Sequence, residues 1–174
     1  MVSIAEAGGA AAFQQDWASQ GITPEYLSVF IPDYKNVVHE RLYAIGVLAQ
    51  GQTLDFNFPP IKHENSDGEY LFEGIIGDDW VFIYFMRANK KTSPHKHSHK
   101  QIEVREDYHL LRGKIFLHLG EDGSSVIELT EDNSFVTVLP DTIHRGSTDA
   151  HFAFVLVRMR GAAPIPRDQL HIAV

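Results

Sequence analysis

Hydrophobic and polar positions alternate with a period of two along much of the chain after residue 50. The clearest case is Thr53-Leu54-Asp55-Phe56-Asn57-Phe58, which predicts a half-buried strand that ends at Pro59. Further strands are predicted at residues 80–86, 108–112, 114–119, 125–129, 135–139 and 151–158, with weaker candidates at 41–49 and 69–72. The segment Gly120-Glu121-Asp122-Gly123 predicts a hairpin turn. Many short strands without intervening helices indicate an all-β antiparallel sandwich or barrel.

The two ends of the chain have a different pattern. Phe13 and Trp17 lie one helical turn apart, and Thr23-Pro24-Glu25 reads as an N-cap, a first-turn proline and an early acid that open a short helix. Its apolar side chains are expected to cover the core. After Gly161, prolines predict an extended tail. We therefore expect a helical or irregular extension over residues 1–40, a β-barrel over 41–160 and a tail over 161–174.

Candidate chemistry is concentrated in Thr92-Ser93-Pro94-His95-Lys96-His97-Ser98-His99. Histidines two residues apart on an extended strand project from the same face, about 6–7 Å apart. His95 and His97 can therefore both reach one metal ion. Apolar strands are predicted on both sides of this segment, so the sequence indicates a metal site built on a β-scaffold.

The same segment resembles the first sequence motif of the cupin superfamily, with Asn89 in a glycine place, then five spacer residues and the His-x-His pair. Glu106 and Gly113 are similar to the second half of that motif. A fainter second motif runs from Phe135 to His144, and its glycine places hold Asn133 and Asp141. The resemblance implies an antiparallel double-stranded β-helix, the cupin jelly-roll barrel. It implies one metal held by His95, His97, Glu106 and His144.

The spacing leaves the carboxylate ligand open, because eight residues separate His97 from Glu106 where the family has three or four. In the alternative frame, His97-Ser98-His99 pairs with Glu103. We prefer Glu106 because its spacing to Gly113 places it at the head of a strand.

The chain has no cysteine, so any metal must use imidazole and carboxylate ligands. Such a set suits Fe(II), Mn(II), Ni(II), Zn(II) or Cu(II), and Fe(II) is our first expectation. Positions left open on the metal would take water, O2 or a substrate.

Composition and charge narrow the function classes. A chain of 174 residues with 44% hydrophobic residues suits one soluble domain, and no apolar run is long enough to span a membrane. The net charge of −8 disfavours nucleic-acid binding. The start of the chain lacks the basic region of a signal peptide, so we expect a cytoplasmic protein.

The positive charge is unevenly distributed. Eight of the 15 Lys and Arg residues fall between Arg87 and Lys114, which gives that stretch a charge of +5. If Lys90, Lys91, Lys96, Lys100 and Arg105 rim the pocket, they steer a small anion inward. A solvated charged loop is an equally good reading.

These patterns predict a metal-dependent enzyme that acts on a small anionic molecule, in the first instance a dioxygenase and alternatively an isomerase or lyase. A non-catalytic cupin that binds a small ligand or a metal is the third reading. We also expect a homodimer.

Overall fold

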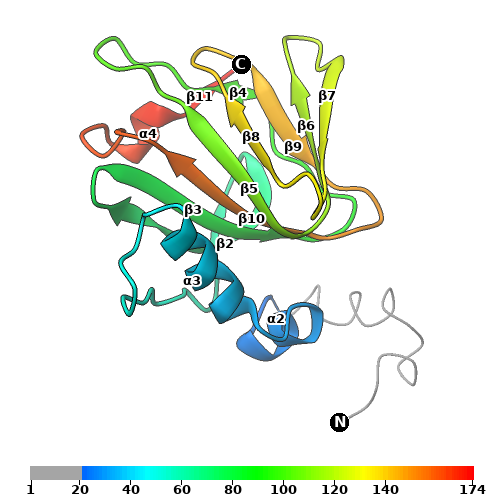
Figure 1. The fold of residues 1–174 in the computed structure, drawn as a ribbon. Coiled ribbons are helices and arrows are strands. Elements are labelled where there is room, and N and C mark those ends of the chain that lie inside the picture. Colours follow the sequence, from blue (N-terminus) through cyan, green and yellow to red (C-terminus); the bar gives the residue numbers. More distant parts are fainter. Residues whose placement is uncertain (1–20) are drawn as a thin grey trace.

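The computed structural model describes residues 21–174, which form two antiparallel sheets that face each other (Figure 1). The six-stranded sheet has the order β1 (Ile61–His63), β2 (Ser66–Ile76), β3 (Asp79–Met86), β10 (Ala153–Met159), β5 (Glu106–Gly113) and β8 (Phe135–Val138). The five-stranded sheet has the order β11 (Ile172–Ala173), β4 (His95–Lys96), β9 (His144–Ser147), β6 (Ile115–Leu119) and β7 (Ser125–Leu129). The predicted all-β antiparallel class is confirmed.

Two helices lie against the outer face of the six-stranded sheet, α2 (Pro24–Phe30) and α3 (Tyr34–Ala44) (Figure 1). The predicted cap is present, because the Thr23 hydroxyl accepts a hydrogen bond of 3.2 Å from the Tyr26 amide. Tyr26 and Leu27 are fully buried against the sheet, which confirms that the apolar side chains of this helix cover the core.

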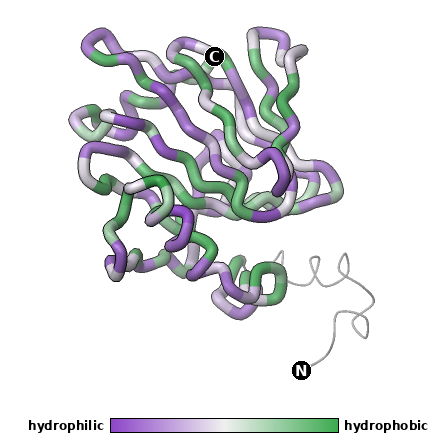
Figure 2. The backbone as a smooth tube through the Cα atoms, in the orientation of Figure 1, coloured by the Kyte–Doolittle hydropathy of each residue, from purple (hydrophilic) through white to green (hydrophobic). Residues whose placement is uncertain are grey.

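Alternation along β3 and β10 separates two hydrophobic cores. In β3, Phe82 and Tyr84 point between the sheets, whereas Val81, Ile83 and Phe85 point toward the helices. Since successive side chains on a strand face opposite ways, a strand covered on both faces is apolar throughout. The hydrophobic stretches of the central strands in Figure 2 reflect this double burial.

The alternating segment 53–58 is not a strand, so that prediction was wrong. Its aromatic rings pack instead against α3: the Phe56 ring lies 5.8 Å and the Phe58 ring 6.4 Å from that of Tyr34. The Leu54 amide donates to Nε2 of His39 over 2.8 Å. A period of two thus arises here from one-sided burial under a helix. The weaker candidate at 41–49 was also wrong, because α3 continues to Ala44.

The C-terminal segment is more ordered than the predicted extended tail. It contains the short helix α4 (Arg167–Leu170) followed by β11, which pairs with β4 at Lys96 and His95. Phe13 and Trp17 lie outside the described residues. The three-part division of the chain stays a prediction. Among residues 21–174, no helix combines the length and apolar character that crossing a membrane requires.

Candidate metal centre

The two sheets bring the four predicted ligands together. His95 on β4 is the register partner of His144 on β9, and His97 follows two residues later on the same side of the chain. Glu106 begins β5 in the opposite sheet, where it pairs with Val138 of β8. The cluster therefore lies between the sheets and draws ligands from both.

One ligand atom from each residue lies within 4.8 Å of the others, and all four residues are buried. Oε2 of Glu106 lies 2.9 Å from Nε2 of His97 and 2.8 Å from Nε2 of His144. These distances suit hydrogen bonds, yet none of the three atoms has a properly oriented partner among residues 21–174. Polar atoms that converge without hydrogen bonds are the arrangement expected around a cation. This group can therefore hold a metal ion.

Backbone carbonyls fix the orientation of all three imidazoles. Nδ1 of His95 lies 2.8 Å from the Ser93 carbonyl, and Nδ1 of His144 lies 2.9 Å from the Thr142 carbonyl. Nδ1 of His97 contacts the carbonyl of Leu170 on α4. Because a carbonyl can only accept, each Nδ1 carries a proton. In a neutral ring Nε2 then presents a lone pair to the cluster, as a metal ligand requires.

The charges of the cluster suit a cation as well. Burial raises the pKa of the Glu106 carboxyl, but His97 and His144 outweigh it and hold that pKa well below its usual range. Burial lowers the pKa of His97, while the Glu106 carboxylate raises it, with a net upward shift. Burial and a neighbouring charge on His144 lower the pKa of His95 to about 3. The cluster thus offers one carboxylate among imidazoles, a donor set that fits a divalent transition metal.

The alternative ligands lie elsewhere. Glu103 is exposed and pairs with Arg105 over 3.4 Å. Nδ1 of His99 accepts a hydrogen bond from the Gln101 amide. Neither His99 nor Glu103 belongs to the buried group. His109 projects from the outer face of β5, where its Nδ1 lies 3.2 Å from Nη1 of Arg41.

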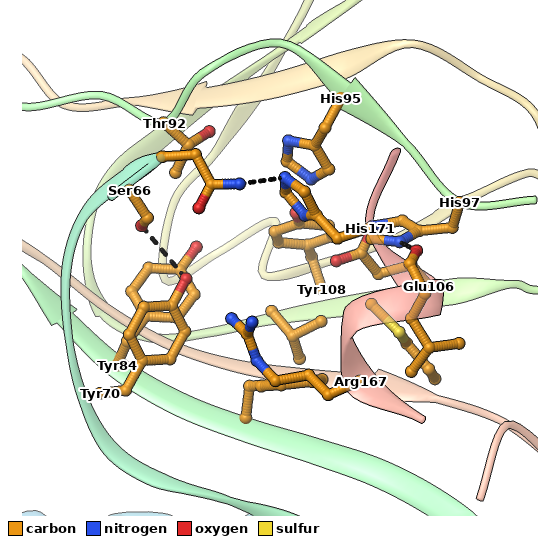
Figure 3. Close-up of a pocket in the computed structure, with 15 residues that line it drawn as sticks. Ser66, Tyr70, Tyr84, Thr92, His95, His97, Glu106, Tyr108, Arg167 and His171 are labelled. Atoms are coloured by element: carbon orange, nitrogen blue, oxygen red, sulfur yellow. Dashed lines mark hydrogen bonds and ion pairs between the residues drawn. The ribbon is translucent and has the colours of Figure 1, made fainter. Parts of the chain in front are cut away.

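A cavity opens beside the cluster, with about 570 Å³ of empty space including its mouth (Figure 3). His95, His97 and Glu106 face this cavity, together with three tyrosines, Tyr70, Tyr84 and Tyr108. Tyr84 is buried in the core between the sheets and also lines the cavity.

Several lining residues were missed from the sequence, namely Asn65, Ser66, Tyr70, Arg167, Leu170 and His171. Asn65 and Ser66 lie at the β1–β2 turn, and the last three lie in the segment predicted to be a plain tail. No spacing or motif links these positions to the histidine pair, so only the fold reveals them.

The lysines and arginine of the basic stretch do not line this cavity. Lys96 lies between two inward-facing histidines and therefore points the other way, toward Asp141 at 3.7 Å. The expected rim of Lys90, Lys91, Lys96, Lys100 and Arg105 is thus not observed. Arg167 is the cationic residue that lines the cavity within residues 21–174.

No protein-family model matches the sequence, and no curated protein matches it. Among solved structures, the oxalate decarboxylase of Lactobacillus farciminis, in complex with formate, is similar with a TM-score of 0.52 and 12% identity. The similarity covers 69% of this chain and 34% of that one. A cupin-like protein from Thermotoga maritima is similar with a TM-score of 0.44 and 15% identity, over 56% of this chain and 65% of that one.

A structure described as DMSP lyases gives a TM-score of 0.41 and 18% identity, over 50% of this chain. The present chain spans only 40% of that lyase chain. At these identities the similarity concerns the fold. The likeness to the oxalate decarboxylase, at a TM-score of 0.52, shows that the two facing antiparallel sheets of this chain share the fold of that structure.

Proposed function

We propose that this protein is a metal-dependent enzyme that acts on a small anionic molecule. The observation that carries the proposal is the convergence of three oriented imidazoles and one carboxylate beside an open cavity. His95, His97, Glu106 and His144 would hold the metal. When bound, a divalent metal supplies a Lewis acid that polarises an oxygen of the substrate. Fe(II) stays the first expectation for its identity.

The tyrosines supply the other chemistry of the pocket. Tyr108 lines the cavity together with Glu106, and the Tyr70 hydroxyl donates to Oγ of Ser66 over 3.1 Å. Burial raises the pKa of Tyr70, Tyr84 and Tyr108, so these phenols keep their protons at neutral pH. Protonated phenols can donate to an oxygen on which negative charge develops.

This arrangement favours an isomerase or lyase reaction, because such reactions need a group that moves a proton or stabilises an oxyanion. A dioxygenase reaction, the first expectation from the sequence, requires O2 to reach the metal but does not require the tyrosine hydroxyls. The related fold of an oxalate decarboxylase supports small organic acids as the substrate class.

The test combines metal analysis with reactions run in air and under argon on a panel of small organic acids. Product formed equally without O2 supports the isomerase or lyase reaction, and Tyr108→Phe should then lower kcat while metal content stays unchanged. Oxygen uptake that depends on substrate would instead establish the dioxygenase reaction. A protein that retains no metal and turns over no acid contradicts the enzyme proposal and favours the non-catalytic binding protein.

We also propose a homodimer, for which the mass measured by light scattering is the test. The cytoplasmic location stays a prediction.

A further inference from the structure

The C-terminal segment, residues 165–173, closes one side of the cavity and is anchored at both ends. At its start, Nε1 of Trp80 donates to the Ile165 carbonyl over 2.8 Å. At its end, β11 pairs with β4, so Ala173 lies opposite His95. Ile165 and Leu170 are buried in the core between the sheets. Residues 165–173 therefore form an ordered wall of the pocket.

This wall touches the metal cluster directly. The His171 ring stacks on that of His95 with a centroid distance of 4.1 Å and an angle of 23°. The amide Nδ2 of Asn65 lies 2.6 Å from Nε2 of His171 and holds that ring in place. The Leu170 carbonyl contacts Nδ1 of His97. One short segment thus orients one ligand and covers another.

Arg167 reaches from the same segment into the cavity (Figure 3). Its Nε contacts the Glu73 carboxylate, and its guanidinium lies 6.0 Å from the centre of the Phe82 ring. The two terminal nitrogens have no hydrogen-bond partner among residues 21–174. The Nε of Arg167 also lacks a hydrogen bond within this range, so Glu73 holds the guanidinium by an ion pair, and the two terminal nitrogens form a fork that matches the two oxygens of a carboxylate.

We propose that residues 165–173 form the substrate-recognition element of the pocket, in which Arg167 binds the carboxylate of a small organic acid. The inference rests on the proposed function and specifies its substrate class. Because the Glu73 carboxylate already offsets part of the charge of Arg167, the guanidinium matches the single negative charge of a carboxylate better than the double charge of a phosphate. The organic acid would lie between Arg167 and the histidine cluster.

The test measures binding of acetate, glycolate, inorganic phosphate and neutral acetamide to the Mn(II)-loaded full chain by calorimetry. The wild type should bind at least one carboxylate about tenfold more tightly than acetamide. Arg167→Gln should weaken that binding about 10- to 100-fold, the loss expected for charge-assisted hydrogen bonds. Its metal content should match that of the wild type, because Arg167 is not a ligand.

Arg105→Gln is the matched control. It removes one exposed arginine that pairs with Glu103 and does not line the cavity, so carboxylate affinity should stay within about twofold of the wild type. Equal losses in Arg105→Gln and Arg167→Gln would show that only the overall charge matters and would overturn the proposal. Tighter binding of phosphate than of every carboxylate would overturn the substrate class.

A chain that stops after Pro166 provides a second measurement. It keeps Ile165 but loses Arg167, the Leu170 carbonyl and β11. Carboxylate binding should disappear, and metal affinity should fall by about 10- to 100-fold because His97 loses the group that orients it. Unchanged metal affinity would contradict the positioning role. A wild-type protein that holds metal but binds no carboxylate refutes this inference alone, whereas one that holds no metal refutes the proposed function.

Discussion

Replacing Glu106 by Gln tests the candidate metal centre most directly, because it removes one charge with almost no change in volume. Glu106 is 4% exposed and is the anionic member of the buried group. Without it, a divalent ion would face three neutral imidazoles and no anionic ligand from the protein. We expect the metal affinity to fall by at least about 100-fold, more than the loss of a hydrogen bond to a ligand costs.

The loss of metal affinity can be measured as a smaller stabilisation of the protein by metal in thermal unfolding. At a free metal concentration of 100 Kd, binding stabilises the wild type by about 2.7 kcal/mol. For a chain of this size that raises Tm by roughly 5–10 °C. After a 100-fold loss the same concentration only equals Kd, and the gain falls to about 0.4 kcal/mol, or roughly 1 °C.

The assay is a melting curve with and without Mn(II) or Zn(II), together with metal content after dialysis. Glu103→Gln is the matched control, because Glu103 is exposed and outside the buried group. It should show the full shift in Tm. An unchanged shift in Glu106→Gln, or a loss in Glu103→Gln instead, would refute the assignment and restore the alternative frame with His99.

Three further predictions follow from particular residues. Burial, with the charge of Arg41, lowers the pKa of His109 from 6.5 to about 4. Between these two pH values His109 is protonated in the unfolded chain but neutral in the folded one, so the free energy of unfolding should fall as the pH drops from 6.5 to 4, by up to about 3 kcal/mol. In His109→Gln this part of the pH dependence of the unfolding free energy should vanish, and an identical curve would contradict the burial of a neutral ring. Gly113→Ala should cost about 3 kcal/mol or more, because φ is +85° and a Cβ would lie 2.0 Å from the Phe152 carbonyl oxygen. Gly161→Ala, with φ of +67° and open space around it, should cost only about 1 kcal/mol in the same urea titration, and equal losses would argue against the clash. Lys100→Glu should leave carboxylate affinity within about twofold of the wild type, since Lys100 does not line the cavity. A large loss of carboxylate affinity in calorimetry would show that the basic stretch contributes to binding after all.

The sequence by itself determined the strands whose side chains are buried and the histidine pair that they carry. Turn residues also act locally, so Gly120-Glu121-Asp122-Gly123 marked the hairpin that joins β6 and β7. Backbone conformation explains two departures from the cupin motif. Asn89 and Asp141 occupy glycine places and have φ of +58° and +60°. Asn and Asp tolerate this left-handed conformation better than other non-glycine residues, so the turns persist without glycine.

Alternation alone could not identify what covers a strand-like segment. The period of two at 53–58 is produced by packing under α3 rather than by a sheet ladder. Only the tertiary structure separates the two cases, because both bury every second side chain on one side.

The tertiary structure also determined which residues surround the metal ligands. Glu106 was favoured by its spacing to Gly113, but its proximity to His97 and His144 arises from the packing of two sheets. Arg167 and His171 are about 70 residues from the histidine pair in the chain and reach it because β11 pairs with the edge of β4. Pairing between distant strands depends on backbone hydrogen bonds that any sequence can make. Side-chain patterns therefore show which residues can bind a metal, while the fold determines which other residues surround it.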